Sequence, residues 1–197
     1  MADHRILIPF IFHFAAGVYG KGGRDLLLPL EKQFELASRK GWSDDPDDPG
    51  GATMIDVTLA TFAAYRRSRS MPSPTKTDLQ GITFGEWEDI LKTMFWDRMK
   101  ADNVRSQAIA NIIVDWIWAS GPSAIRRIQT AVGVKADGIV GPLTLQAINE
   151  ADAGTLFTNI RRMREIHYRQ CRGAWKYLHG WLRRLNAILP DGSFDFR

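Results

Sequence analysis

The chain has 197 residues, of which 45% are hydrophobic and 24% are charged, a balance typical of one globular domain or of a domain with a small appendage. This composition excludes a mainly disordered protein, which would be depleted in apolar residues. Lysine and arginine outnumber aspartate and glutamate by 26 to 22, and the pI of about 9.4 favours an anionic partner without specifying which one.

The N-terminal region predicts neither a membrane span nor a secretory signal. Its longest apolar run, from Ile6 to Gly20, is interrupted by Pro9 and His13 and is shorter than the ~20 residues that a spanning helix needs. We therefore expect no integral membrane segment. Asp3 stands where a secretory signal would carry positive charge.

The cysteine and histidine content predicts no metal site and no cofactor. Cys171 is the one cysteine of the sequence, so it cannot form an internal disulfide. No group of cysteine and histidine residues has the spacing of a zinc site. We expect Cys171 to be a small buried or half-buried residue.

The N-terminal half is predicted to alternate helices with polar loops. Apolar residues at helical spacing predict helices over 3–16 and 24–40, with Pro9 and Pro29 near first turns or kinks. Residues 42–53, WSDDPDDPGGAT, are too rich in proline, glycine and aspartate for a regular element, so we expect a shaped loop. Residues 71–81 are predicted to be a second polar connection.

The remaining segments are predicted to be helical. Thr83 and Glu86 have the spacing of a capping box ahead of an apolar helix face. Asn103 is expected to cap the next helix, which ends near Ser120. Further helices are predicted over 123–132, 142–149, 155–172 and 176–189, with Pro142 at a first helical position. No convincing strand is visible, so the sequence predicts an all-α fold.

The first loop holds four closely spaced aspartates: Asp44, Asp45, Asp47 and Asp48. Because they repel one another, the loop is a solvated surface, a cation site or a set of carboxylates held for catalysis. The calcium interpretation is weak, since the alternate ligands and closing glutamate of a calcium loop are absent. Gly50-Gly51 allows a sharp turn that holds Thr53 at a fixed angle to the acids. This geometry suits the floor of an active site.

Three segments carry a resemblance to a known family. DDPDDPGGAT, followed by Val57-Thr58 and Thr61-Phe62, resembles the signature of glycoside hydrolase family 108, a muramidase family that includes secretion activators. Residues 115–121, DWIWASG, are similar to the family's helix end. Residues 128–149, IQTAVGVKADGIVGPLTLQAIN, are similar to the peptidoglycan-binding segment that follows the catalytic part.

This resemblance implies a fold, an activity and a partner. It implies a lysozyme-like helical domain over 1–122 and a small helical peptidoglycan-binding segment with C-terminal helices over 123–197. The implied reaction cuts the bond between N-acetylmuramic acid and N-acetylglucosamine. A protonated glutamate donates to the glycosidic oxygen, while a second polar group positions water or stabilises the oxocarbenium-like transition state. The family's downstream Asp and Thr match Asp48 and Thr53.

The general acid is where the sequence departs from the family. In the family this glutamate begins a Glu-Gly-Gly-aromatic motif at the end of the first helix. Counting back from Asp48 without gaps places Arg39 there, and a guanidinium cannot donate the proton. The alignment that restores the helix, the glycine and the aromatic residue together places Ala15 there, with residues 20–41 as an insertion.

The absence of the glutamate leaves three interpretations. The chain is a disabled Glu-to-Ala variant of an active muramidase, or it is a natural relative that binds the cell wall without cutting it, or another group replaces the acid. Glu35 is the nearest candidate to replace the acid, although a glutamate on a helix is more commonly an exposed surface residue. His13 titrates in a suitable range, but a lone histidine on an apolar helix is usually hydrogen-bonded in the core.

Further residues are candidates for contact with the glycan. Trp42 and Asp45 lie on the acidic loop. Trp116 and Trp118 are about 200° apart on a helix, so at most one of them faces a cleft. Asp115 beside them is a substrate group, a supporting group, or a helix-end charge satisfied by backbone amides. In the wall-binding segment the candidates are Asp137 and Thr144, although the same motif can simply shape a turn and start a helix.

The expected partner is peptidoglycan. Basic clusters at 66–69, 161–164 and 176–184 also permit a basic helical nucleic-acid binder. We favour solvated helix faces and expect no nucleic acid partner. Under the family resemblance, the protein is made in the bacterial cytoplasm and acts at the cell wall or periplasm after export by a route without a signal peptide.

Overall fold

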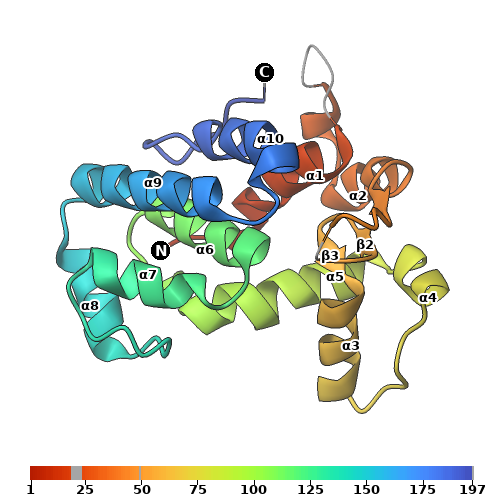
Figure 1. Ribbon diagram of the computed structural model, residues 1–197, viewed down its shortest axis with the longest axis horizontal. Helices are drawn as coiled ribbons and strands as arrows, with labels where there is room; N and C mark the ends of the chain where they lie inside the picture. Colours follow the sequence, from red (N-terminus) through yellow and green to blue (C-terminus); the bar gives the residue numbers. More distant parts are fainter. Residues whose placement is uncertain (19–23, 49, 197) are drawn as a thin grey trace. The chain divides into compact units, whose positions relative to one another are not determined.

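The computed structural model describes residues 1–18, 24–48 and 50–196 and has a mostly helical, lysozyme-like fold with one small sheet (Figure 1). Its α-helices are α1 (Ile8–Ala16), α2 (Leu30–Ser38), α3 (Leu59–Ser68), α4 (Lys76–Gln80), α5 (Phe84–Ile90), α6 (Gln107–Ser120), α7 (Ala124–Ala131), α8 (Pro142–Glu150), α9 (Ala153–Gln170) and α10 (Ala174–Asn186). The strands are β1 (Trp42–Ser43), β2 (Thr53–Met54) and β3 (Val57–Thr58). None of the helices in these ranges has both the length and the apolar character needed to cross a membrane.

The chain forms two compact units. The N-terminal unit comprises Arg5–Met94 together with Phe196, and the C-terminal unit comprises Met1–His4 and Phe95–Asp195. The division falls inside a π-helical segment, Leu91–Trp96, that continues α5. The domain boundary that the sequence predicts after Pro122 is a different division of the chain and stays a prediction.

The N-terminal unit contains the small sheet. β1 pairs antiparallel with β2, with Ser43 opposite Thr53, and β2 pairs antiparallel with β3, with Thr53 opposite Thr58. The sequence predicted a loop without regular structure over 42–53. This prediction is wrong at the two ends of the segment, which form β1 and β2. Each strand has only two residues, which is too short for an alternating pattern to be visible in the sequence.

The turn between β2 and β3 has an unusual backbone. Ile55 and Asp56 have φ values of +48° and +61°, which a tight two-residue hairpin requires and which a β-branched residue rarely adopts. Ile55 is nonetheless fully buried. Its amide donates to the carbonyl of Gly41 at 2.8 Å, and a Cβ atom on Gly41 would lie only 2.6 Å from Cγ1 of Ile55.

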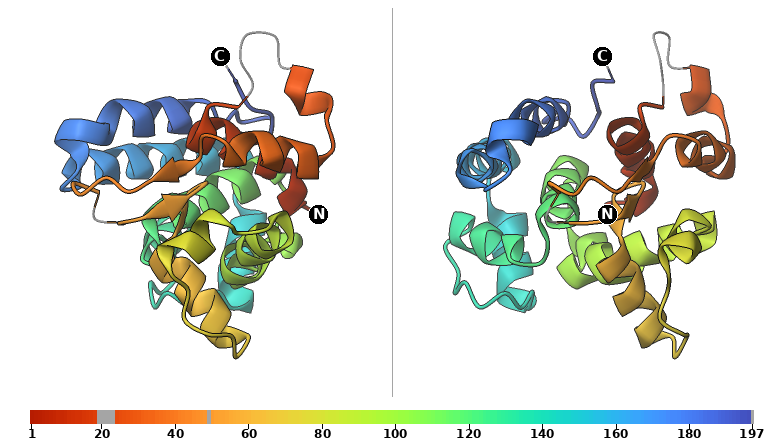
Figure 2. Two further views of the ribbon diagram at one scale, coloured as in Figure 1. Left: turned by 90° about the vertical axis from the view of Figure 1, so that its right-hand side faces the viewer. Right: turned by 45° about the vertical axis from the view of Figure 1, so that its right-hand side comes forward.

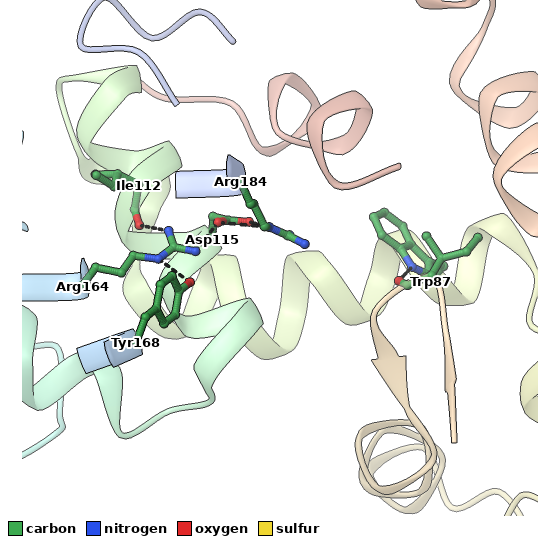
Figure 3. Close-up of polar contacts among 7 residues, drawn as sticks. Trp87, Ile112, Asp115, Arg164, Tyr168 and Arg184 are labelled. Atoms are coloured by element: carbon green, nitrogen blue, oxygen red, sulfur yellow. Dashed lines mark hydrogen bonds and ion pairs between the residues drawn. The ribbon is translucent and has the colours of Figure 1, made fainter. Parts of the chain in front are cut away.

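Trp87 of α5 connects this turn to the core of the N-terminal unit by a hydrogen bond and by ring packing. Its indole Nε1 donates to the carbonyl of Ile55 at 3.0 Å, a contact drawn in Figure 3. The ring centroid of Trp87 lies 4.8 Å from that of Phe12 on α1 and 6.3 Å from that of Phe34 on α2. One buried side chain therefore contacts two helices and the strained hairpin turn.

The C-terminal unit is built around α6. This helix contacts α7 and α9, and α9 contacts α10 along its other side (Figures 1 and 2). Residues 108–118 of α6 are all buried, as expected of a helix that is apolar nearly all round. The unit therefore has a helical core with the α9–α10 hairpin on its outside.

Several local predictions are confirmed. Thr83 and Glu86 form the capping box of α5, with each side chain bonded to the other residue's backbone amide. Pro9 lies in the first turn of α1, and Pro142 is the first residue of α8. Pro29 is the N-cap of α2. Each of these residues therefore marks a helix start in the structure.

Other local predictions are wrong. The helix expected over 24–40 is a short 3-10 turn, Arg24–Leu27, followed by α2. Ser106 caps α6, whereas Asn103 ends a separate 3-10 turn. The helix α3 is absent from the sequence-based predictions, and so is α4, which lies inside the polar connection at 71–81. The capping box of α4, Thr75 with Asp78, was the signal that could have revealed it.

Replacing Trp87 by phenylalanine tests the role of the indole. Trp87→Phe removes the donor to the carbonyl of Ile55 and leaves that buried acceptor without this bond, which costs about 1–3 kcal/mol. The smaller ring adds a packing loss. We expect the denaturant midpoint of unfolding to fall, with Trp175→Phe as a control because Trp175 is exposed. Equal midpoints for the two variants would contradict this role.

Candidate active site and wall-binding segment

Ala15 lies in the last turn of α1 and is half-buried. Gly17 ends this helix in the left-handed conformation, with φ of +62°, and its amide donates to the carbonyl of His13 at 2.9 Å. The helix therefore ends at Ala16, directly before Gly17, and the assignment of residue 15 to the position of the general acid stays a prediction. The methyl group of Ala15 can neither donate nor accept a proton.

The two replacement acids have other roles in the structure. Nδ1 of His13 lies 2.7 Å from the carbonyl oxygen of Val18, and its ring contacts the rings of Phe14 and Phe196. Glu35 is exposed and forms an ion pair with Lys32 at 2.9 Å, one turn away on α2. These contacts match the common structural roles rather than catalytic ones.

The acidic loop is shaped by its own aspartates. Oδ1 of Asp48 accepts from the amide of Gly50 at 2.8 Å, and Oδ1 of Asp45 accepts from the amide of Asp47 at 3.0 Å. Asp44 instead forms an exposed ion pair with Lys76 at 2.7 Å. Across 1–18, 24–48 and 50–196, no three acidic, histidine or cysteine side chains are grouped as metal ligands.

Backbone contacts in the N-terminal unit link α2 to the turn that follows β2, whereas a common site formed by residues 15, 48 and 53 stays a prediction. α1 packs against α2, whose Ala37 carbonyl accepts from the amide of Gly41 at 2.8 Å. Gly41 in turn accepts from Ile55, directly after β2, which carries the half-buried Thr53. Trp42 on β1 is also half-buried.

Asp115 is the centre of a buried ion cluster in the C-terminal unit (Figure 3). Nη2 and Nε of Arg184 donate to Oδ1 of Asp115 at 2.6 and 3.0 Å, and Nη2 of Arg164 donates to Oδ2. Nε of Arg164 also donates to the hydroxyl of Tyr168 at 2.7 Å. The carboxylate is therefore satisfied by guanidinium groups from α9 and α10, and not by backbone amides.

Burial and charge act in opposite directions on Asp115. Burial alone would raise the pKa of this carboxyl, but the guanidinium groups of Arg184 and Arg164 outweigh it and hold the pKa below its usual value. The side chain has no exposed surface. The predicted contact between Asp115 and a glycan is therefore incompatible with this structure, in which Asp115 joins three helices.

The two tryptophans beside Asp115 are also core residues. Trp116 is fully buried and Trp118 is 7% exposed. The ring of Trp118 packs edge-on against Phe95 at 4.8 Å, and the indole nitrogen of Trp116 has no hydrogen-bond partner. Neither ring offers a flat face to a sugar, which corrects the prediction for both residues.

The wall-binding motif is organised by Gln129 of α7, a residue that the sequence analysis did not select. Its Nε2 lies 2.9 Å from Oδ1 of Asp137, 3.0 Å from the carbonyl of Ile139 and 3.3 Å from Oγ1 of Thr144. Its Oε1 accepts from the amide of Gly138 at 2.8 Å. Gln129 and Thr144 are both buried. The spacing of Gln129 to the Asp-Gly pair was visible in the sequence, but nothing there marked the residue as buried.

This network uses the polar groups of the motif internally. The amide of Ile139, together with the Gln129 side chain, lowers the pKa of Asp137. The motif residues that reach solvent are apolar, since Ile139 is 73% and Leu143 is 74% exposed. Asp137 and Thr144 therefore shape the turn and the start of α8, and their predicted contact with the glycan stays a prediction.

Comparison with known proteins finds two family matches in the chain. Residues 35–121 match the family described as glycosyl hydrolase 108, and residues 123–186 match the family described as a predicted peptidoglycan domain. A search of curated proteins found no match. Among solved structures, the "Structure of Brucella abortus SagA" is similar, with 26% sequence identity and a TM-score of 0.68 over 75% of this chain and 82% of that chain.

The fold and these matches define a lysozyme-like protein with a peptidoglycan-related function. More specifically, residues 35–121 match the model of the glycosyl hydrolase 108 family, and the match to the predicted peptidoglycan domain follows them in the same chain. The family resemblance seen in the sequence is therefore confirmed. Ala15 lies outside the residues that match.

Replacing Asp115 by asparagine tests the buried cluster. Asp115→Asn keeps the size of the side chain but leaves two buried guanidinium groups without a counter-charge, which costs about 3–5 kcal/mol of the free energy of unfolding. Because the folded-state pKa is lowered, the carboxylate contributes fully above about pH 4 and loses its contribution as the pH falls through the folded-state pKa. The difference between wild type and variant should therefore shrink in acid.

Urea unfolding at neutral pH and at low pH measures this difference. Asp44→Asn is the matched control, because its exposed ion pair contributes little at any pH. A difference between Asp115→Asn and wild type that stays constant with pH would contradict the role of the charge.

Replacing Gln129 by leucine tests the wall-binding turn. Gln129→Leu leaves the Gly138 amide and the Ile139 carbonyl without these bonds, and we expect a loss of about 1–3 kcal/mol. Hydrogen exchange should accelerate at the Gly138 amide. The control is Gln146→Leu on α8, because Gln146 is exposed and bonds to Glu150. Unchanged protection of Gly138 in Gln129→Leu would count against the network.

Proposed function

We propose that the protein is a peptidoglycan hydrolase of the N-acetylmuramidase type whose general acid is missing, because alanine occupies its position. One observation carries this proposal: two family matches follow each other in one chain. The glycosyl hydrolase 108 match comes first, and the match to a peptidoglycan-binding domain follows it directly. Such a pairing places a glycan-cutting fold beside a wall-binding one, which raises the local concentration of the substrate.

The roles of the other groups follow from lysozyme-type chemistry. A glutamate at residue 15 would protonate the leaving oxygen, Asp48 would position water, and Thr53 would stabilise the charge that develops on the sugar ring. Asp48 is half-buried on a turn that its own carboxylate holds, and Thr53 is held between two strands. Both therefore have restricted positions, as such roles require.

Ala15 itself favours a second candidate, a protein that binds peptidoglycan without cutting it. Neither Glu35 nor His13 is positioned as a substitute acid, since the first is exposed and the second contacts Val18. In both candidates the protein acts at the cell wall or periplasm. A cutting form would open the wall during secretion or lysis.

Restoring the acid separates the two candidates. We expect Ala15→Glu to release reducing ends from purified peptidoglycan at a pH between mild acid and neutral, at a rate roughly a hundredfold or more above the unaltered chain. Ala15→Gln is the matched control, because it has the same shape without a proton to donate. Asp48→Asn in the Ala15→Glu chain should abolish the gain.

Binding to the wall is measured independently. The unaltered chain should sediment with insoluble peptidoglycan whether or not it cuts. Binding together with no activity of Ala15→Glu at any pH would leave the non-catalytic candidate, and absence of both binding and activity would overturn the proposed function altogether.

A further inference from the structure

The α9–α10 hairpin carries a strong excess of positive charge. Residues 153–186 contain eight arginine and lysine residues and one acidic residue, Glu165. Arg164 and Arg184 form buried ion pairs with Asp115 inside the C-terminal unit. The other six are at least partly exposed, and of these Arg169 forms an ion pair with Glu165 and Arg161 bonds to Asn186.

Part of this charge gathers where α9 turns into α10. We call Arg169, Arg172, Trp175 and Lys176 the hairpin tip. All four side chains are exposed, and Trp175 is 78% exposed, an unusual value for a residue that is mostly buried in proteins. Its exposure is not a general property of α10, since Trp181 packs 5.4 Å from the ring of Tyr168 on α9.

The outer side of α10 continues this surface. At 100° per residue, Trp175, Lys176, His179 and Arg183 lie within about 100° of one another around the helix. All four are exposed, whereas the half-buried residues Tyr177, Leu178, Trp181 and Leu182 cover the rest of the circumference, with Leu182 next to Trp175. The helix is therefore amphipathic, with its apolar side packed on the protein and a cationic side, including one indole ring, in solvent.

We propose that the hairpin tip and the outer side of α10 bind the surface of a bilayer rich in anionic phospholipid. Lysine and arginine near such a surface are attracted by its negative potential, and tryptophan is enriched at the headgroup level because its ring is apolar and its N–H is polar. The cations would also attract a nucleic acid or a charged wall polymer, and an indole ring can stack on a base or a sugar. Because tryptophan beside lysine and arginine is the combination found at the headgroup level, we commit to lipid, and binding to either polymer is an outcome of the test.

This proposal is independent of the cutting or binding of peptidoglycan, and vesicles without peptidoglycan test it. The probes are vesicles of phosphatidylcholine alone and vesicles in which about one third of the lipid is phosphatidylglycerol. We expect the full chain to sediment with the anionic vesicles and not with the neutral ones, and binding should weaken as salt is added.

Two variants remove the surface features separately. Arg172→Gln with Lys176→Gln should lower the partition coefficient roughly thirtyfold, because each basic residue contributes about fivefold at an anionic surface. Trp175→Ala should weaken binding and remove the blue shift of tryptophan fluorescence that accompanies it. Because all three residues are exposed, the folds of these variants should be unchanged by circular dichroism.

Matched controls remove the same groups elsewhere. Arg39→Gln with Lys40→Gln changes the net charge equally at exposed positions after α2, and Leu27→Ala removes an exposed apolar side chain. Equal binding to neutral and anionic vesicles, or equal losses in the control and tip variants, would overturn the proposal. So would a loss of peptidoglycan or DNA binding in the tip variants without any vesicle binding, which would assign the surface to that polymer.

Discussion

The hydrogen bond from Trp87 to the carbonyl of Ile55 is the constraint on which the N-terminal unit depends. A β-branched residue with positive φ persists only where its surroundings determine the backbone strongly. Here the indole, the Gly41 carbonyl and the absence of a Cβ atom on Gly41 together provide that constraint. Since β2 leads directly into this turn, the position of Thr53 depends on a residue in α5 that no catalytic motif includes.

The residues of the two family motifs divide into those that shape the protein and those that remain free for chemistry. Asp115, Trp116 and Trp118 belong to the core, and Asp137 and Thr144 are engaged by Gln129. A family motif therefore contains structural residues as well as functional ones, and burial is what distinguishes them. In the wall-binding segment the large apolar side chains left in solvent are those of Ile139 and Leu143.

The predictable part of this structure is local. The helix starts at Thr83, Pro9 and Pro142 could be predicted because each depends on a few neighbouring residues. The partners of Asp115 could not, because Arg164 and Arg184 follow it by 49 and 69 residues and look like two members of solvated basic clusters. The helix end at Ala16 could be predicted from Gly17, whereas the two-residue strands beside the acidic loop are set by tertiary contacts.

The Asp115 cluster also bears on how such proteins can diversify. Asp115 lies in the glycosyl hydrolase 108 segment, whereas Arg164 and Arg184 lie in the peptidoglycan domain that follows it. If recombination replaced one segment by that of a distant relative, a buried charge would be left unpaired. The new segment would have to supply a partner of opposite charge. The cluster therefore couples the two segments energetically, and shortening the chain after Pro122 would leave Asp115 without its two arginine partners.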